Sequence, residues 1–141
     1  GIVDVDMGAD EIMYFERWYV KPDGDDYQDG KSWATAFKTI SQGISAACDN
    51  DLITVAEGTY AENINFSGYA ITIQSVDPMN WNVVEATVID GSGSGSVVTF
   101  NNGETSYSVL DGITVANGSS YQGGGIYINN SSPIIRNCVI R

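Results

Sequence analysis

The chain has 141 residues, the size of one domain, and carries a formal net charge of −12 from 18 acidic and 6 basic residues. That charge argues against binding to nucleic acid, where Lys and Arg must neutralise phosphates, and against adsorption to an anionic membrane surface. No apolar run approaches the roughly 20 residues of a membrane-spanning helix, and the absence of histidine excludes Ser-His-Asp and Cys-His catalysis and His-ligated zinc.

Residues 1–51 contain two predicted segments. Apolar and acidic residues alternate at the start of residues 1–20, which is the pattern of a strand. The stretch KPDGDDYQDGKS follows as a turn-rich acidic loop. Apolar residues then recur at steps of three and four, as on an amphipathic helix, at Trp33, Phe37, Ile40, Ile44 and Ala47. With Ser32 as N-cap and Asp49-Asn50-Asp51 as stop, we predict an acidic loop and helix over residues 21–51, the helix itself at 33–47.

Residues 52–141 consist of short apolar strands separated by Gly, Ser, Asn and Pro, with few of the tight two-residue turns of hairpins. An internal repeat organises them, because VLDGITV and IIRNCVI superpose at a step of 25 residues. A repeat of this length with two or three strands is typical of stacked β-coils. We therefore predict an all-β chain: a right-handed parallel β-helix (solenoid), incomplete at its C-terminal end, whose first coil is covered by the amphipathic helix.

The repeat assigns inward positions in each coil, since a slip of one residue would expose the whole apolar set. The side chains expected to point inward are Ile53, Val55, Ile64, Phe66, Ile71, Ile73, Val98, Phe100, Leu110, Ile113, Val115, Ile126, Ile128, Ile135, Cys138 and Ile140.

Four stretches resemble a known family. YVKPDGDDYQDGKSWATAFKTISQGI and ITVAEGTYAENI resemble the opening of bacterial right-handed parallel β-helix proteins of the pectin lyase-like superfamily. GGGIYINNSSPIIRNCVI is similar to their repeat and to that of polymorphic outer-membrane proteins, and DVDMGADE resembles the segment that closes such β-helices. Because a closing segment precedes an opening cap, residues 1–20 are expected to be a closing or junction strand. The resemblance implies a secreted or cell-surface bacterial protein.

Candidate site residues lie in three places. Asp111 and Arg136 occupy equivalent outward positions in adjacent coils and should meet, either as part of a substrate groove or as a surface ion pair. Trp81, in the predicted loop DPMNWNVVE, offers an aromatic face for a sugar ring. The acidic loop invites a calcium site at Asp23, Asp25 and Asp29, with Asp26 nearby; the alternative is a solvated turn whose carboxylates bond their own backbone.

Two classes of function follow. The first is a non-catalytic extracellular or cell-surface module with a structural, adhesive or filament-forming role, partnered by further β-helix coils or by head-to-tail self-association. The second is a fragment of a polysaccharide lyase or glycoside hydrolase, or a glycan-binding module. We expect no cofactor other than calcium and no activity from this chain alone, since it lacks histidine and a clustered acid–base pair.

Overall fold

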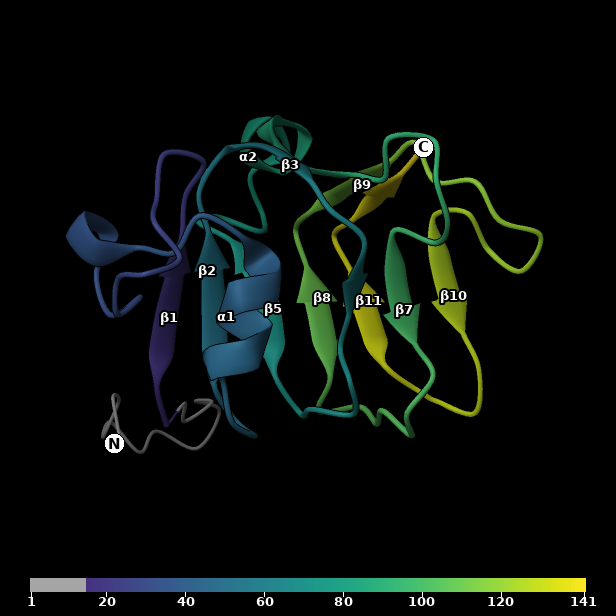
Figure 1. Ribbon diagram of the computed structural model, residues 1–141. Helices are drawn as coiled ribbons and strands as arrows, with labels where there is room; N and C mark the ends of the chain where they lie inside the picture. Colours follow the sequence, from purple (N-terminus) through teal and green to yellow (C-terminus); the bar gives the residue numbers. More distant parts are fainter. Residues whose placement is uncertain (1–14) are drawn as a thin grey trace.

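The computed structural model describes residues 15–141, so the predicted closing segment at residues 4–11 lies outside the described residues. The described chain is mostly β-strand with three short helices (Figure 1). The strands are β1 Arg17–Val20, β2 Leu52–Val55, β3 Gly58–Ala61, β4 Ile64–Asn65, β5 Thr72–Ser75, β6 Thr87–Asp90, β7 Val98–Phe100, β8 Val109–Asp111, β9 Thr114–Ala116, β10 Ile126–Ile128, β11 Ile134–Arg136 and β12 Val139–Ile140. The helices are the 3₁₀ helix η1 Trp33–Thr35 and the α-helices α1 Ile40–Ala46 and α2 Trp81–Ala86.

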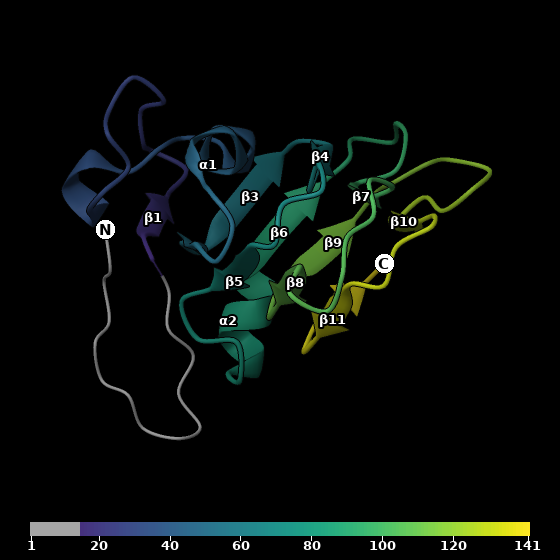
Figure 2. The same ribbon diagram turned by 90° about the horizontal axis from the view of Figure 1, so that it is seen from below.

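The strands form three parallel sheets. One has five strands in the order β1-β2-β5-β8-β11, one has four in the order β12-β9-β6-β3, and one has three in the order β10-β7-β4. All pairings between these named strands are parallel. From β2 onward the chain visits the five-, four- and three-stranded sheets in the same cyclic order. We call each round a passage: β2-β3-β4, β5-β6-β7, β8-β9-β10 and β11-β12 (Figures 1 and 2). The expectation of a chain built mainly from parallel strands is confirmed.

The strand register follows the 25-residue repeat. Leu110 pairs with Ile135, and Val115 pairs with Ile140. The neighbouring three-stranded sheet pairs Val98 with Ile126. Because parallel partners keep equivalent residues on the same face, the repeat read from the sequence corresponds to the ladder of the sheets.

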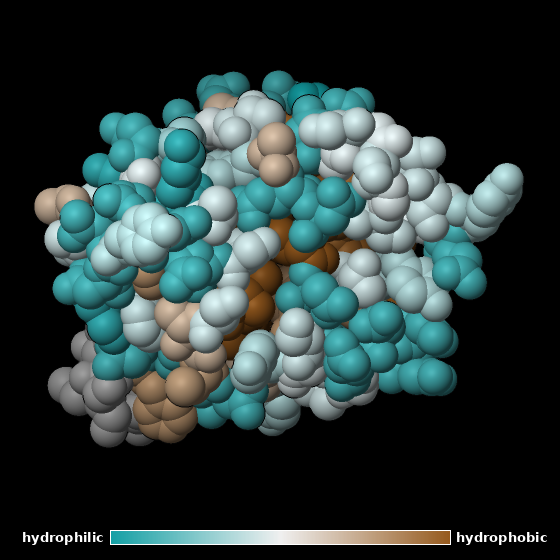
Figure 3. Space-filling model, in the orientation of Figure 1, coloured by the Kyte–Doolittle hydropathy of each residue, from teal (hydrophilic) through white to brown (hydrophobic). Residues whose placement is uncertain are grey.

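The core lies between the sheets and contains most of the side chains expected to point inward. Those from Ile53 to Val115 are at most 2% exposed. Figure 3 shows one face of the molecule as mostly polar, with the apolar interior visible only in a narrow crevice beside α1. In β10, β11 and β12 the expectation of burial is only partly met, because each of these strands has a neighbour on one side only among the described residues. Ile128 is 46% exposed and Ile140 is 51% exposed.

The predicted helix at 33–47 is wrong in extent. The chain forms the 3₁₀ turn η1, then an extended stretch, and then α1, whose N-cap is Thr39. The extended stretch exists because its backbone bonds to β1: the amide of Phe37 donates to Tyr19 O and that of Lys21 donates to Phe37 O, both at 2.9 Å. Trp33 was expected to be buried but is 39% exposed, since it precedes the part of this segment that reaches the core.

Helix α1 packs on β1, β2 and β4. Its Ile40 and Ile44 are buried in the same cluster as Val20 and Ile53. The helix approaches closely because Gly43 has no side chain: a Cβ there would lie 3.3 Å from Ile53 and 3.4 Å from Val20. Glu62 supports the first turn by accepting hydrogen bonds from the first two amides of the helix at 2.8 and 3.0 Å.

Candidate functional site

Helix α2 was not predicted, because the sequence around it reads as a loop. Asn80 begins the helix by accepting a hydrogen bond from the amide of Asn82 at 3.0 Å. The helix lies between β5 and β6, where later passages have only residues 112–113 and 137–138 between the corresponding strands. Figures 1 and 2 show α2 outside the sheets, at the edge where β5 ends. Among the described turns from the five-stranded to the four-stranded sheet, this one is therefore enlarged, while the others are tight.

The enlarged corner packs on the passages that follow. Val84 is 2% exposed, and its carbonyl accepts a hydrogen bond from Thr114 Oγ1 at 2.8 Å. Pro78 rests on Gly112, whose φ is +72° and whose hypothetical Cβ would lie 2.4 Å from Pro78 Cα. These contacts fix α2 against the corner between β8 and β9.

A pocket of about 200 Å³ opens between α2 and the corner of the last passage. We call it the corner pocket; its lining residues are Pro78, Met79, Trp81, Val84, Asn137 and Cys138. Met79 is 81% exposed and Trp81 is 60% exposed, so two large apolar side chains border the pocket without being buried by the fold. The residue predicted as a sugar platform thus lies at the mouth of a pocket rather than on a loop.

The predicted pair of Asp111 and Arg136 forms beside this pocket. Arg136 Nε donates to Asp111 Oδ2 at 3.0 Å, and Asn137 Nδ2 donates to Asp111 Oδ1 at 2.9 Å. The expectation that both are outward surface residues needs correction, because Asp111 is only 5% exposed. It is flanked along the ladder by Gln74 and Arg136 and covered by Asn137. The other N–H groups of Arg136 have no partner within residues 15–141.

The thiol of Cys138 faces the same pocket but is not activated. Burial raises the pKa of Cys138. Its Sγ lies 3.1 Å from Arg136 O and 3.5 Å from Leu110 O, as donor to both. A thiol held protonated is a poor nucleophile. Since the chain also has no histidine, the corner pocket is better suited to binding than to covalent catalysis.

The carboxylates of the acidic loop bind the loop itself. Asp25 Oδ1 accepts from the amide of Tyr27 at 2.9 Å, and Asp29 Oδ1 accepts from Thr35 Oγ1 at 2.6 Å. The hydrogen bond from Thr35 lowers the pKa of Asp29. Asp23 is exposed on the same loop.

Asp26 belongs to the cap. It accepts hydrogen bonds from the amides of Lys38 and Thr39 and from the hydroxyl of Thr39 at 2.8–2.9 Å, and so fixes the start of α1. Within the part of the chain that the structure describes, no three His, Cys, Asp or Glu side chains are arranged to hold a metal ion. A calcium site at Asp23, Asp25 and Asp29 stays a prediction.

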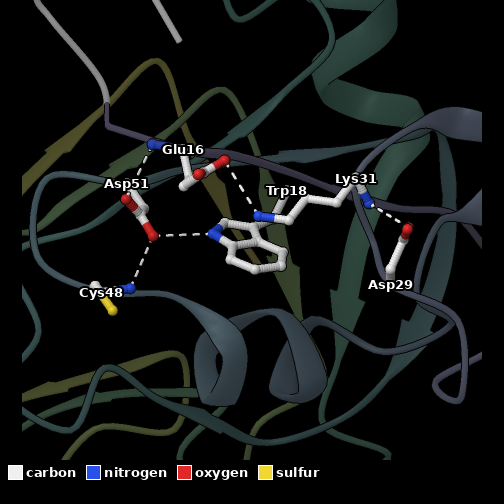
Figure 4. Close-up of polar contacts among 6 residues, drawn as sticks. All are labelled: Glu16, Trp18, Asp29, Lys31, Cys48 and Asp51. Atoms are coloured by element: carbon white, nitrogen blue, oxygen red, sulfur yellow. Dashed lines mark hydrogen bonds and ion pairs between the residues drawn. The ribbon is translucent and has the colours of Figure 1, made fainter. Parts of the chain in front are cut away.

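Two buried carboxylates were missed by sequence reasoning. The first is Asp51, which is 2% exposed and joins the start of β1 to the end of α1 (Figure 4). It accepts from the amide of Glu16 at 3.1 Å, from Trp18 Nε1 at 2.9 Å and from the amide of Cys48 at 2.8 Å. Lys31 Nζ lies over the Trp18 ring, 3.8 Å from its centroid.

The second is Glu104, also 2% exposed. It accepts hydrogen bonds from the amides of Asn102 and Gly68 at 2.8 and 2.9 Å and from Ser131 Oγ at 2.9 Å, and so connects three passages. Burial acts to raise the pKa of Glu104, but these hydrogen bonds outweigh it and hold the pKa below its ordinary value. Both carboxylates are structural, because all their partners are groups of the fold.

Comparison of the chain with protein-family models, with curated proteins and with solved structures found no match. No helix within residues 15–141 is long and apolar enough to cross a membrane. What the corner pocket can bind therefore follows from its lining residues and their contacts alone.

Proposed function

We propose that this chain is the capped beginning of a right-handed parallel β-helix that works as a non-catalytic structural module. The observation that carries the proposal is the fixed cyclic order in which the chain visits three parallel sheets. A chain that returns to each sheet one strand further along, always in parallel, builds a stack of coils. The right hand follows from the strong preference for right-handed crossovers between parallel strands.

The two ends of the proposed stack differ, and the difference supports the addition of further coils at one of them. The outer edge of β1 is occupied, because Tyr19 donates to Gly30 O and accepts from Phe37. At the opposite end β10, β11 and β12 are the outermost strands of their sheets, and Ile128 and Ile140 are about half exposed. On this side, each of the three sheets ends in a strand with an unpaired edge among the described residues. Whatever packs there must therefore supply three parallel strands at once. A further coil of the same kind meets this requirement, whereas the occupied β1 edge of a second copy does not.

The chemistry of the described residues favours a non-catalytic role. Asp111 is bound by Arg136 and Asn137, Cys138 is protonated, and the chain has no histidine. The resemblance of residues 19–44 and 53–64 to bacterial β-helix proteins supports secretion or display at the bacterial surface, where long β-helices serve as scaffolds or adhesins.

The proposal is tested by adding one coil. A second copy of residues 117–141 is joined after Arg141, which continues the 25-residue phase. Ile128→Asp should then lower the free energy of unfolding by about 2–4 kcal/mol, because the side chain becomes buried, against about 1 kcal/mol or less in the original chain. Val76→Asp is the matched control, since Val76 is also 46% exposed but lies away from this end. Equal losses for Ile128→Asp in both chains would contradict the stacking proposal.

Light scattering on the original chain distinguishes the two groups that could pack on the exposed strand edges, a further coil or a second copy of the chain. A single mass across concentrations is expected if only a further coil fits the open end. A mass that grows with concentration and returns to that of a monomer with Ile140→Lys would show that a second copy covers the end instead.

A further inference from the structure

The corner pocket is bordered by side chains that the fold does not need. Val84 anchors α2, and its carbonyl bonds Thr114, so the helix is held without the exposed Met79 and Trp81. A Trp that is 60% exposed at the rim of a concave site leaves a large apolar surface in water. Among aromatic residues, Trp offers the largest rigid face for a partner. The placement indicates a ligand with one apolar face.

The opposite wall supplies hydrogen-bonding groups held in place by the sheets. Asn137 lines the pocket and is fixed by its bond to Asp111. Arg136 is held by the same carboxylate through Nε but does not line the pocket. Polar groups that are already oriented bind a ligand without the loss of side-chain entropy that mobile groups would incur. The ligand should therefore carry several hydroxyl or similar groups around its edge.

Charge narrows the ligand class. The residues that line the pocket include no charged side chain, so the pocket presents hydrogen-bonding groups without a net charge. The chain as a whole carries −12, which repels polyanions such as uronate polymers. A neutral ring with an apolar face and polar edges fits both observations, and that is the chemistry of a neutral sugar.

The size of the pocket limits how much of a ligand it holds. Its volume of about 200 Å³ is below the roughly 300–1,000 Å³ of sites for drug-sized molecules. One sugar ring, at an end or a side of a longer chain, is a suitable occupant. Such a small contact gives weak binding to one ring, which several copies or several coils would strengthen.

We propose that the corner pocket binds a ring of a neutral glycan, with Trp81 under the apolar face of the ring and the side-chain amide of Asn137 donating to or accepting from its hydroxyl groups. This function goes beyond the structural role and does not depend on what covers the open end of the stack. Asp111 is a positioning residue, since it holds the Asn137 side chain in place without lining the pocket itself.

Binding is tested by calorimetry and ligand-observed NMR on the whole chain, with oligosaccharides of glucose, xylose, mannose or galactose and with an oligogalacturonate. We expect at least one neutral oligosaccharide to bind and Trp81→Ala to weaken that binding by about tenfold or more. Trp33→Ala is the control, because Trp33 is also exposed but belongs to the cap and contacts Tyr19 at a centroid distance of 4.8 Å.

A second variant removes the polar wall without disturbing the backbone. Asn137 has φ +53°, and the equivalent position of the preceding passage is Gly112 at φ +72°, so Asn137→Gly keeps a compatible conformation. It should weaken binding by about three- to tenfold. The proposal is overturned if no neutral oligosaccharide binds, if Trp81→Ala binds as well as wild type, or if the oligogalacturonate binds as tightly as the best neutral ligand.

Discussion

Replacing Gly112 by Ala should destabilise the protein by displacing the corner that carries α2. At φ +72° any side chain has backbone strain, which costs about 1–2 kcal/mol. In addition, the new Cβ would lie 2.4 Å from Pro78 Cα and 2.6 Å from Pro78 Cβ, atoms of a rigid ring that must move away. Overpacking of this kind costs about 1–3 kcal/mol. The total expected loss in the free energy of unfolding is about 2–5 kcal/mol.

Gly93→Ala separates the two contributions. Gly93 has φ +76°, but a Cβ there would meet nothing within 4 Å, so this variant has the strain without the collision. Urea unfolding followed by circular dichroism gives both free energies. We expect Gly112→Ala to be less stable than Gly93→Ala by at least about 1 kcal/mol. Equal losses, within about 0.5 kcal/mol, would refute the close contact between Pro78 and Gly112.

Four further measurements test the rest of the structure. Glu104→Gln should lower the free energy of unfolding by about 1–3 kcal/mol near neutral pH, because an amide NH₂ then faces backbone donors. Since the folded-state pKa of Glu104 is lowered, this stabilisation is present above its unfolded pKa and is lost as the pH falls through the folded value. Urea midpoints of wild type and Glu104→Gln should therefore converge in acid, and a constant difference would contradict this assignment. Asp51→Asn should lower stability by roughly 2–3 kcal/mol in thermal unfolding, because one of its three donors loses its acceptor. Phe37→Ala should cost about 3–5 kcal/mol, as for a buried aromatic residue, and Trp33→Ala clearly less; similar losses would show that Phe37 does not pack as described. Added calcium should raise the thermal midpoint if the predicted site at Asp23, Asp25 and Asp29 binds the ion, and Asp29→Asn should remove the rise; an unchanged midpoint would show that the hydrogen bonds of Asp29 within the loop exclude a metal ion.

The ladder of strands could be predicted from the sequence because stacked parallel strands place equivalent residues above one another. Most inward positions meet an apolar partner in the next passage, as Ile73 meets Leu110, whereas Val55 meets Ser75. The repeat spacing is therefore largely a consequence of packing. The same reasoning predicted the contact between Asp111 and Arg136, which are partners in the register of β8 and β11. It did not predict the burial of Asp111, because this depends on Asn137 at the following corner.

The helices were harder to predict, because their boundaries depend on tertiary hydrogen bonds. Apolar residues at Trp33 and Phe37 continue the helical spacing of Ile40 and Ile44, so the periodicity favours one long helix. The backbone of Phe37 is instead more favourably bonded at the edge of β1, which the spacing does not encode. Helix α2 has only six residues, too few for an apolar stripe, and its one local signal is the N-cap Asn80.

The two buried carboxylates have no motif, because most of their partners are main-chain amides. Asp51 was interpreted as part of a helix stop, although it bonds the chain 35 residues earlier at Glu16. Glu104 reaches Gly68, 36 residues earlier, and Ser131, 27 residues later. An amide donor looks the same at every residue, so only the folded path identifies which ones meet.

The position of the corner pocket follows from what parallel ladders tolerate. An insertion within a strand would shift every later residue to the opposite face, whereas an insertion at a corner leaves the strands in register. Helix α2 is such an insertion, and it leans over corners that remain tight at residues 112–113 and 137–138. The concavity exists because an enlarged corner overhangs regular ones; a stack with identical corners would present no hollow there. For this reason the corner of α2, rather than the regular strands, is where recognition of a ligand can be altered without loss of the fold.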